Sequence, residues 1–422
     1  MKTLMASLTA SAALLLPAAS QAQDLTIWAI QAFNQQADEL ITRMAEDFGT
    51  ERGISVEYSI VPANVLNERL AAAIQGNAMP DVFMNVGQQV QYFARLGVTQ
   101  PLDDILTEMR AVEGGIYEST VSSLMYEGQA MALPLEVDVV PMYARKDLLE
   151  EVGLGLPKTL DELRAASQAI LEKNPAITAF GLPTSTANDA EAQARMLIWS
   201  FGGKMFDETG TEVTWNSPET IAAYQFIADM FTEGTIPRST LTWDDGGNNT
   251  AYQTGRAAFI MNPPSVYNWL RENDAELLAD TALIAMPAGP GENGRSATML
   301  STFSWMVSNR SERQDDAMAW LRYFFEPANY EKIIDTVGGR WIPIYPGMTA
   351  SMPLFAENPD FANFDEMARN GVVDGHAGPP SAWAATVNTA KIVTQSIQRM
   401  LVDGETPEDA VAWAASRIEE AR

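Results

Sequence analysis

The sequence of 422 residues contains no cysteine and a single histidine, His376. The absence of cysteine excludes disulfide bridges, thiolate metal sites, thiol nucleophiles and thioether attachment of a lipid. With one histidine, a serine–histidine triad or a histidine-rich metal site can be built only around His376. Because no nucleophile motif lies near it, we expect His376 to be a surface or loop residue. We predict no catalytic residue, no metal site and no cofactor.

Positive charge is also scarce, since 27 lysines and arginines face 55 aspartates and glutamates and give a formal net charge of −28. A field of this sign repels phosphate backbones and anionic lipid headgroups, which argues against nucleic acid as a partner. It says little about a single pocket, because charges beyond a Debye length of about 8–10 Å are screened. Apolar residues make up 46% of the chain, enough for two or three lobes with real cores.

Residues 1–22 have the pattern of a secretion signal. Lys2 is followed by an apolar run at 4–19, and Ser20-Gln21-Ala22 places small residues where a signal peptidase cuts. The run, about 15 residues, is short for a membrane span of about 20, although an N-terminal anchor is the alternative. We predict cleavage before Gln23. A secreted protein without a lipid needs an enclosing compartment to stay near its membrane, which predicts the periplasm.

The chain after this signal alternates between strand and helix patterns. The predicted elements are a strand at 24–29, a helix at 34–48, a strand at 54–60, a helix at 65–74 and a strand at 81–85. This order predicts a parallel α/β sheet. Ligands of such sheets bind at the carboxyl ends of the strands, so we expect ligand-contacting loops at 30–35 and 84–89.

Several helix starts carry capping chemistry, which locates helices without indicating a function. The predicted caps are Thr159 with Glu162, Ser311 with Gln314, Thr406 with Asp409, and Ser217 before Pro218.

Two motifs match functional signatures by letter only. Residues 289–294 fit the GxGxxG pattern, but a proline interrupts them and no helical pattern follows, so we predict no nucleotide site. Residues 207–212 resemble part of a calcium loop without the full ligand spacing, and Thr209-Gly210 predicts a hairpin turn instead.

Tryptophans at strand ends or in loops are more informative. An indole offers a flat surface for the apolar face of a sugar ring, and planar polar groups bind the hydroxyl rim. The tryptophans with this placement, and the polar residues beside them, are Trp28 with Gln31 and Asn34, Trp243 with Asp244 and Asp245, Trp341 with Arg340, and Trp383. The pattern predicts a carbohydrate cleft, while a place in the core is the alternative for each indole.

A secreted glycosidase is the enzyme-class alternative, because acidic residues are plentiful. Its chemistry needs two carboxylates about 5–10 Å apart across one glycosidic bond. No motif in the sequence marks such a pair, so we predict a protein that binds its ligand without altering it.

Beyond these features, the chain resembles extracellular solute-binding protein family 1, the maltose-binding-protein-like sugar-binding proteins of ABC importers. The likeness covers nearly all of the chain after the signal. It rests on segments in the family's order, namely MPDVF at 79–83, PLD at 101–103, the stretch from YEGQ to KDLL at 126–149, PKTLDEL at 157–163, FGG with FD at 201–207, NSPE at 216–219 and GRAAF at 255–259.

The resemblance implies an α/β, two-lobed periplasmic binding protein fold (type II) with a multi-segment hinge and an interlobe ligand cleft. The expected parts are an N-terminal lobe at 24–136 plus 303–338, a C-terminal lobe at 139–297 plus 346–422, and a hinge near 137–138, 298–302 and 339–345. The function it implies is capture of a sugar, sugar alcohol or small oligosaccharide by a monomer. The transmembrane permease subunits of an ABC importer are the implied partner.

Pocket positions carry over from the resemblance residue by residue, and Asp138 is expected to accept hydrogen bonds from sugar hydroxyls. With the loop tryptophans, the predicted ligand-binding residues are Trp28, Gln31, Asn34, Asn85, Gln88, Asp138, Trp243, Asp244, Tyr267, Arg340, Trp341 and Trp383. Two departures matter. Tyr267 is expected to stand in for an absent Gly-x-Trp segment, and Arg145 replaces an asparagine. Arg145 and Arg340 leave an anionic sugar derivative (a sugar acid, sulfonate or phosphate) as the alternative ligand.

Overall fold

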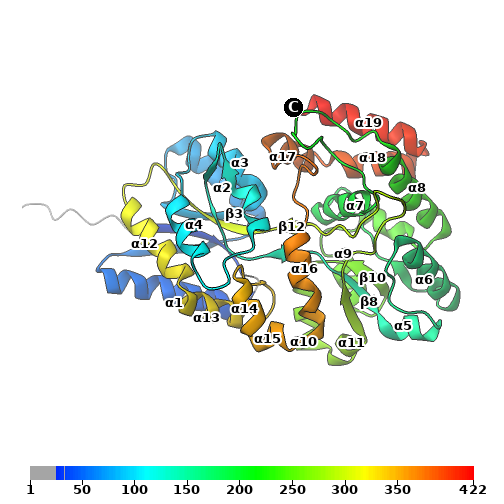
Figure 1. The fold of residues 1–422 in the computed structure, drawn as a ribbon, viewed down its shortest axis with the longest axis horizontal. Coiled ribbons are helices and arrows are strands. Elements are labelled where there is room, and N and C mark those ends of the chain that lie inside the picture. Colours follow the sequence, from blue (N-terminus) through cyan, green and yellow to red (C-terminus); the bar gives the residue numbers. More distant parts are fainter. Residues whose placement is uncertain (1–24, 33) are drawn as a thin grey trace, which may run out of the picture.

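The computed structural model describes residues 25–32 and 34–422, and it shows two α/β bodies joined by several chain segments (Figure 1). The predicted signal, its cleavage position and Asp24 lie outside the described residues. Among the helices of the described part, none has the length and apolar character that crossing a bilayer requires.

The first body, here called the N-lobe, is built on a five-stranded sheet with the strand order β2-β1-β3-β13-β6. Its strands are β1 (Leu25–Ile30), β2 (Val56–Val61), β3 (Val82–Val86), β6 (Leu133–Pro134) and β13 (Phe303–Val307). The first three are parallel, with Leu25 opposite Val56, whereas β13 runs antiparallel to both β3 and β6. The predicted parallel α/β start of the chain is therefore confirmed, and a strand from more than 200 residues later completes its sheet.

The N-lobe helices follow the apolar spacing of the sequence. They are α1 (Gln35–Arg52), α2 (Ala63–Gly76), α3 (Gly87–Arg95), α4 (Asp103–Arg110), α12 (Gln314–Phe325) and α13 (Pro327–Val337). In α1, Ile41, Met44 and Phe48 are buried in the core, and Asn34 caps the first turn by accepting from the N–H of Ala37. The helix ends at Gly53, whose φ of 66° is a conformation that glycine adopts without strain.

The second body, the C-lobe, is built on a four-stranded sheet with the order β11-β8-β10-β9. Its strands are β8 (Met142–Arg145), β9 (Thr178–Phe180), β10 (Ala257–Met261) and β11 (Thr281–Ile284). Its helices are α5 (Lys146–Glu151), α6 (Leu160–Lys173), α7 (Asn188–Ser200), α8 (Pro218–Glu233), α9 (Gly247–Gln253), α10 (Ser265–Asn273), α11 (Ala275–Ala279), α17 (Ala382–Thr389), α18 (Ile392–Asp403) and α19 (Pro407–Glu420). The last two helices pack against α7 and α8, so the end of the chain closes this core.

Two short strands, here called the connecting strands, lie between the lobes (Figure 1). They are β7 (Asp138–Val139) and β12 (Leu300–Ser301), which pair antiparallel with Ser301 opposite Asp138. An antiparallel bridge between Val137 and Ile342 places a third segment between the lobes, here called the third crossing, beside these strands. A fourth segment joins this group, because the N–H of Leu300 donates to the carbonyl of Val372 at 2.8 Å.

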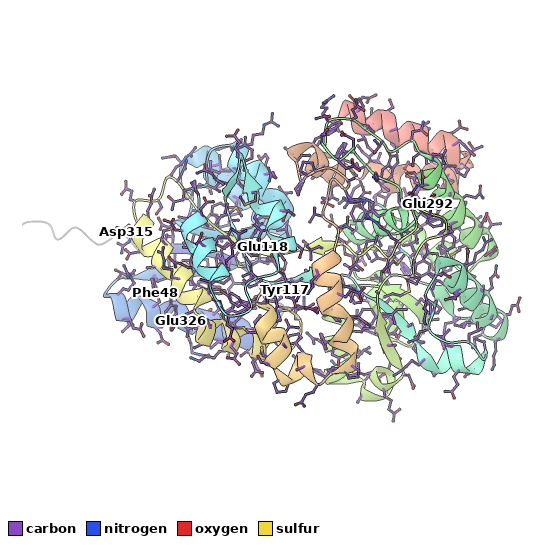
Figure 2. The ribbon with its side chains drawn as sticks, viewed as in Figure 1. Phe48, Tyr117, Glu118, Glu292, Asp315 and Glu326 are labelled. Carbon is purple, nitrogen blue, oxygen red and sulfur yellow. The ribbon has the colours of Figure 1, made fainter. Side chains whose placement is uncertain are left out.

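The chain after α13 contacts both lobes. It forms α14 (Pro346–Ser351), α15 (Pro353–Ala356) and α16 (Ala362–Asn370), and α16 stands between the two bodies in Figure 1. On the N-lobe side, Tyr117, labelled in Figure 2, donates its hydroxyl to Asp365 Oδ1 at 2.7 Å. On the C-lobe side, Asn358 Nδ2 donates to the hydroxyl of Tyr267. This segment therefore ties the lobes together outside the connecting strands.

Most of the predicted local signals are confirmed. Thr159 forms a capping box with Glu162, Ser217 and Thr406 cap α8 and α19, and a turn at 208–210 lies beside the Phe206–Val213 bridge. Ser311 is wrong as the cap of α12, whose cap position is Arg313. The hydroxyl of Ser311 donates to Asp81 Oδ1 at 2.6 Å and accepts from the N–H of Arg313, so it joins a tertiary contact to the turn before α12.

Candidate ligand-binding site

A cavity of about 260 Å³, here called the interlobe cavity, lies where the connecting strands meet the C-lobe. Its polar lining comes from the connecting strands, the first two turns of α7, the segment after α16 and the helix α17. These residues are Asp138, Asn188, Asp189, Gln193, Arg195, Ser301, Asp374 and Asn388. Val86, at the end of β3, is its contribution from the N-lobe.

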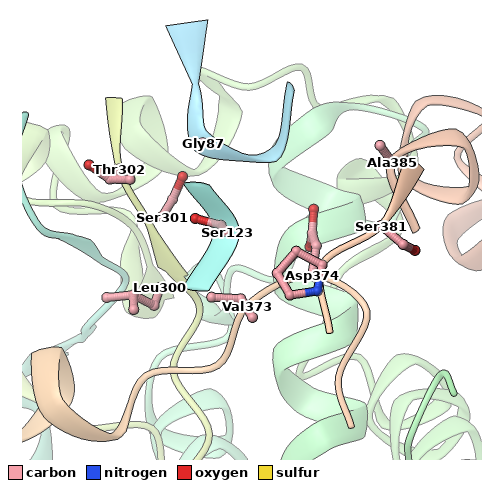
Figure 3. Close-up of a pocket in the computed structure, with 10 residues that line it drawn as sticks. Gly87, Ser123, Leu300, Ser301, Thr302, Val373, Asp374, Ser381 and Ala385 are labelled. Carbon is pink, nitrogen blue, oxygen red and sulfur yellow. The ribbon is translucent and has the colours of Figure 1, made fainter. Parts of the chain in front are cut away.

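The interlobe cavity continues along the boundary between the lobes. Ser301 and Asp374 also line a narrow pocket with Ser123, Gly87 and Ala385, which is shown in Figure 3. Ala385 in turn lines a groove of about 780 Å³ between α17 and the helices α2 and α3. Shared lining residues therefore connect the connecting strands to the outer edge of the lobe boundary.

Asp138 places an unsatisfied carboxylate oxygen at the interlobe cavity. Its Oδ1 is buried and accepts no hydrogen bond from the described residues, while Arg340 Nη1 lies 3.9 Å away. Burial raises the pKa of Asp138, and the charge of Arg340 acts in the opposite direction. An oxygen in this state is stabilised by any ligand that donates a hydrogen bond to it.

Glu136 lies two residues earlier on the same connection and is fully buried. Its Oε1 accepts from the N–H of Phe303 at 2.7 Å. Burial, and then the charge of Asp138, raise the pKa of Glu136 well above its usual range. Of the two carboxyl groups, Glu136 therefore has the stronger tendency to keep its proton, and Asp138 is the one closer to Arg340 and to the interlobe cavity.

Gln193 supplies a second unsatisfied acceptor. It lies on α7, is 2% exposed, and its Oε1 has no donor among the described residues. An unsatisfied buried polar atom costs about 1–3 kcal/mol, so a ligand that satisfies it gains binding energy. Gln193 Oε1 and Asp138 Oδ1 both require a donor, and a hydroxyl group provides one.

Arg195 is the one cation that lines the interlobe cavity, and its charge is already compensated. Its Nη1 lies 2.5 Å from Asp374 Oδ1, and the two side chains are 1% and 4% exposed. Arg195 Nε donates to the carbonyl of Glu191, and Asn388 Nδ2 donates to the second oxygen of Asp374. The Arg195–Asp374 ion pair therefore forms part of the cavity wall, and the charge of Arg195 does not need an anionic ligand to balance it.

Asp189 adds a titratable carboxyl group at the start of α7. The N–H of Asp189 donates to Asp245 Oδ1 at 2.9 Å, so two carboxylates lie close together. Burial, followed by the charges of Asp245 and Asp138, raises the pKa of Asp189 to about 7, and Lys391 opposes the rise. Asp189 therefore changes its charge near neutral pH.

We expect the variant Asp189→Asn to gain stability relative to the parent as the pH rises from about 4 to 8. In the unfolded chain this carboxyl ionises near pH 3.8, whereas the folded protein keeps its proton up to about pH 7. The native state then binds more protons in this window, so the parent loses stability with rising pH. The relative gain should reach about 1–3 kcal/mol in urea unfolding of the ligand-free protein.

Asp161→Asn is the matched control, because Asp161 is the exposed second residue of α6 as Asp189 is the second residue of α7. Both substitutions remove a first-turn charge, which is worth about 0.3–1 kcal/mol at a helix N-terminus. A stability difference for Asp189→Asn that is the same at both ends of the pH range would contradict a titration of Asp189 there.

The predicted binding residues of the N-lobe are largely engaged within the protein. The guanidinium of Arg69 lies 3.8 Å from the ring centre of Trp28, which covers one indole face. Asn34 caps α1 and donates to the carbonyl of Thr336, while Gln31 is half-buried in the loop after β1.

The predicted residues at the end of β3 are also engaged or undescribed. Asn85 is 3% exposed and donates to Asn67. Gln88 lies in α3, and its side chain is outside the described residues.

The predicted residues of the C-lobe and of the third crossing take different places. Trp243 is half-buried, and Asp244 is exposed and accepts from the N–H of Gly246. Trp341 is 1% exposed and Tyr267 is 4% exposed, so each is part of the core. Trp383 packs 4.3 Å from the ring of Phe206. Its indole N–H donates to the carbonyl of Ile418 in α19. Trp341 and Trp383 are therefore engaged in packing in this conformation.

Neither arginine that suggested an anionic ligand is without a carboxylate. Both nitrogens of the Arg145 fork contact Asp147, and Arg340 lies beside Asp138. Asp138 is the predicted residue that lines the interlobe cavity, and the residues from α7, α17 and position 374 were missed. No signal in the sequence marks them, because α7 has the pattern of a core helix.

Comparisons with known proteins show similarity to bacterial binding proteins. The model of the family described as bacterial extracellular solute-binding protein matches residues 32–331. A binding protein of Brucella abortus (strain 2308) is 23% identical over 74% of both chains. The lactose-binding protein of Rhizobium radiobacter is 24% identical over 80% of this chain and 79% of its own. The solute-binding protein of an ABC transporter from Thermotoga lettingae, solved with α-D-tagatose, is 20% identical. It covers 94% of this chain and 99% of its own, with a TM-score of 0.80.

Proposed function

Because this chain belongs to the bacterial extracellular solute-binding proteins, we propose that it binds a neutral sugar or sugar alcohol between its lobes and delivers it to the permease of an ABC importer. The observation that carries the proposal is that two residues lining the interlobe cavity, Asp138 and Gln193, each hold a buried acceptor without a donor among the described residues, Oδ1 and Oε1 respectively. A polyhydroxylated ligand donates to both. The ligands named for the relatives, lactose and α-D-tagatose, belong to the same chemical class.

The charges around the interlobe cavity favour a neutral ligand over an anionic one. Among the described residues that line it, Asp138, Asp189 and Asp374 are acidic and Arg195, paired with Asp374, is basic; Arg340 and Lys391 lie behind this lining and are occupied with Asp138 and Asn188. A carboxylate or phosphate on the ligand would face this negative lining without a charged donor of its own. A hydroxyl-rich ligand instead meets oxygens that accept its hydrogen bonds.

The place of the interlobe cavity also suggests how binding is sensed. Its walls include the connecting strands, α7 of the C-lobe and Val86 of the N-lobe. A ligand that contacts both lobes at once binds a closed arrangement better than an open one, and this difference in affinity drives closure. We propose that the permease recognises the closed arrangement of a monomer exported to the periplasm, and that the ligand leaves unaltered.

We expect native mass spectrometry of freshly purified protein to show a bound neutral carbohydrate. A thermal-shift panel should then show stabilisation by sugars or sugar alcohols and none by the matching sugar acids. At 100 times its dissociation constant, a ligand stabilises the fold by about 2.7 kcal/mol.

Two results would contradict the proposal. One is a panel in which only anionic derivatives stabilise the protein. The other is release of product from an aryl glycoside at a rate that a single carboxylate substitution abolishes, which would indicate a glycosidase.

A further inference from the structure

A second cavity, of about 430 Å³, lies in the C-lobe and shares none of its lining residues with the interlobe cavity. We call it the Arg295 cavity. It is formed by the loop after α7, the start of α8, the loop before residue 297 and the segment at 376–377. Its positively charged and donor groups are Lys204, Ser217, Asn293 and Arg295, with His376 beside them.

Arg295 lacks the counter-charge that comparable arginines have. In the described part of the chain, each other arginine that is buried or half-buried has a carboxylate oxygen within 4 Å. These pairs are Arg145 with Asp147, Arg164 with Asp229 and Glu233, Arg195 with Asp374, Arg313 with Asp316, Arg340 with Asp138 and Arg399 with Glu405. Among the described residues, Arg295 has no such pair, and its buried Nε has no acceptor.

The one side-chain partner that the structure shows for Arg295 is uncharged. Arg295 Nη2 hydrogen-bonds to Nε2 of His376. Burial, followed by the charges of Arg295 and Lys204, lowers the pKa of His376 to about 4, so the ring is neutral at physiological pH. A neutral ring with an accepting Nε2 carries its proton on Nδ1. It therefore satisfies one guanidinium N–H without balancing the charge.

The two carboxylates at the rim do not fill this role either. Glu208 Oε1 lies 3.2 Å from Lys204 Nζ, and Glu219 Oε1 accepts from Asn293 Nδ2 at 2.9 Å. Glu208 is exposed to solvent and Glu219 is half-buried. Burial lowers the pKa of Arg295, and no neighbouring carboxylate acts against that fall. Arg295 therefore carries a positive charge with no carboxylate oxygen within 4 Å among the described residues, while Glu208 and Glu219 are occupied with Lys204 and Asn293.

We propose that the Arg295 cavity binds a small oxyanion, namely phosphate, sulfate or the carboxylate of a small acid. The planar guanidinium fork matches the oxygens of such groups and makes charge-assisted hydrogen bonds to them. Lys204 and the hydroxyl of Ser217 are further donors at the same cavity. The site is independent of the interlobe cavity and gives the protein a second ligand besides its transported solute.

Isothermal titration at constant ionic strength tests this site. We expect phosphate, sulfate or acetate to bind the parent protein saturably with one site, and Arg295→Gln to raise the dissociation constant about tenfold or more. Direct binding is needed, since sulfate and phosphate also stabilise proteins by exclusion from their surface. Arg164→Gln is the matched control, because it removes a half-buried, paired arginine from the same lobe. It should leave anion binding unchanged.

Further variants keep the test decisive. Arg295→Lys retains the charge and loses the fork, so it should bind more weakly than the parent and more tightly than Arg295→Gln. Lys204→Gln alters an exposed side chain and should weaken anion binding even if the Arg295 variants do not fold. No saturable binding by the parent, or equal binding by Arg295→Gln, would overturn the proposal. Unchanged sugar affinity in Arg295→Gln separates this site from the proposed transport function.

Discussion

Replacing Asp138 with asparagine is expected to weaken sugar binding by about 10- to 100-fold while the protein stays folded. The substitution keeps the shape of the side chain and removes the charged acceptor at the interlobe cavity. Hydrogen bonds to charged groups are worth about 1.5–3 kcal/mol, which corresponds to this range of dissociation constants. Burial disfavours the ionised form of Asp138 and the charge of Arg340 favours it, so urea unfolding of the variant should accompany the binding measurement.

Asp244→Asn is the matched control for this measurement. Asp244 is exposed and its side chain accepts from the N–H of Gly246 within its own loop. Calorimetry with the sugar found in the ligand screen should show less than about a twofold change for this variant. Both aspartates were predicted as contacts from the sequence, so equal losses would favour the family-based set of residues. A loss at Asp244 alone would contradict the interlobe cavity as the binding site.

Asp374→Ala is expected to destabilise the protein by about 3–5 kcal/mol, because it leaves the charge of Arg195 buried without a partner. The side chains of Arg195 and Asp374 are 1% and 4% exposed. In the variant, Arg195 Nε still donates to the backbone carbonyl of Glu191, which carries no charge. The effect is measured as a lower urea midpoint with an unchanged slope. The double variant Arg195→Met/Asp374→Leu should recover most of the loss, since apolar residues of similar size often replace a buried ion pair without cost.

An exposed pair provides the comparison for this effect. Arg110 and Glu118 lie 2.7 Å apart with side chains that are 42% and 60% exposed. Glu118→Ala should change the free energy of unfolding by less than about 1 kcal/mol. A loss below 1 kcal/mol for Asp374→Ala would mean that water reaches Arg195 and that the wall of the interlobe cavity is not closed.

The start of the fold was predictable because its signals are local. The alternation of strand and helix up to β3 follows from apolar spacing over a few residues, and the caps at Thr159, Ser217 and Thr406 follow from chemistry within one turn. The failure at Ser311 has the opposite cause, since its hydroxyl bonds to Asp81, 230 residues away. A local pattern does not reveal a contact of that separation.

The candidate site was less predictable for the same reason. Its lining joins Asp138 to α7 and to position 374, and nothing in the spacing of these segments shows that they meet. An indole in a loop pattern is also ambiguous, because the rest of the fold decides whether it is covered. Trp383 lies beneath the last helix, and Trp341 is enclosed by the core.

The strand order has a consequence for how the polypeptide reaches this structure. In the N-lobe sheet, β13 lies between β3 and β6, so this sheet stays incomplete until the chain has been made through residue 307. The C-lobe core in turn needs α18 and α19 from the last residues. Contacts of such high sequence separation slow folding, because large loops must close before the contacts form. A chain that emerges N-terminus first therefore spends most of its synthesis without a complete lobe, a state that suits transport across a membrane before folding.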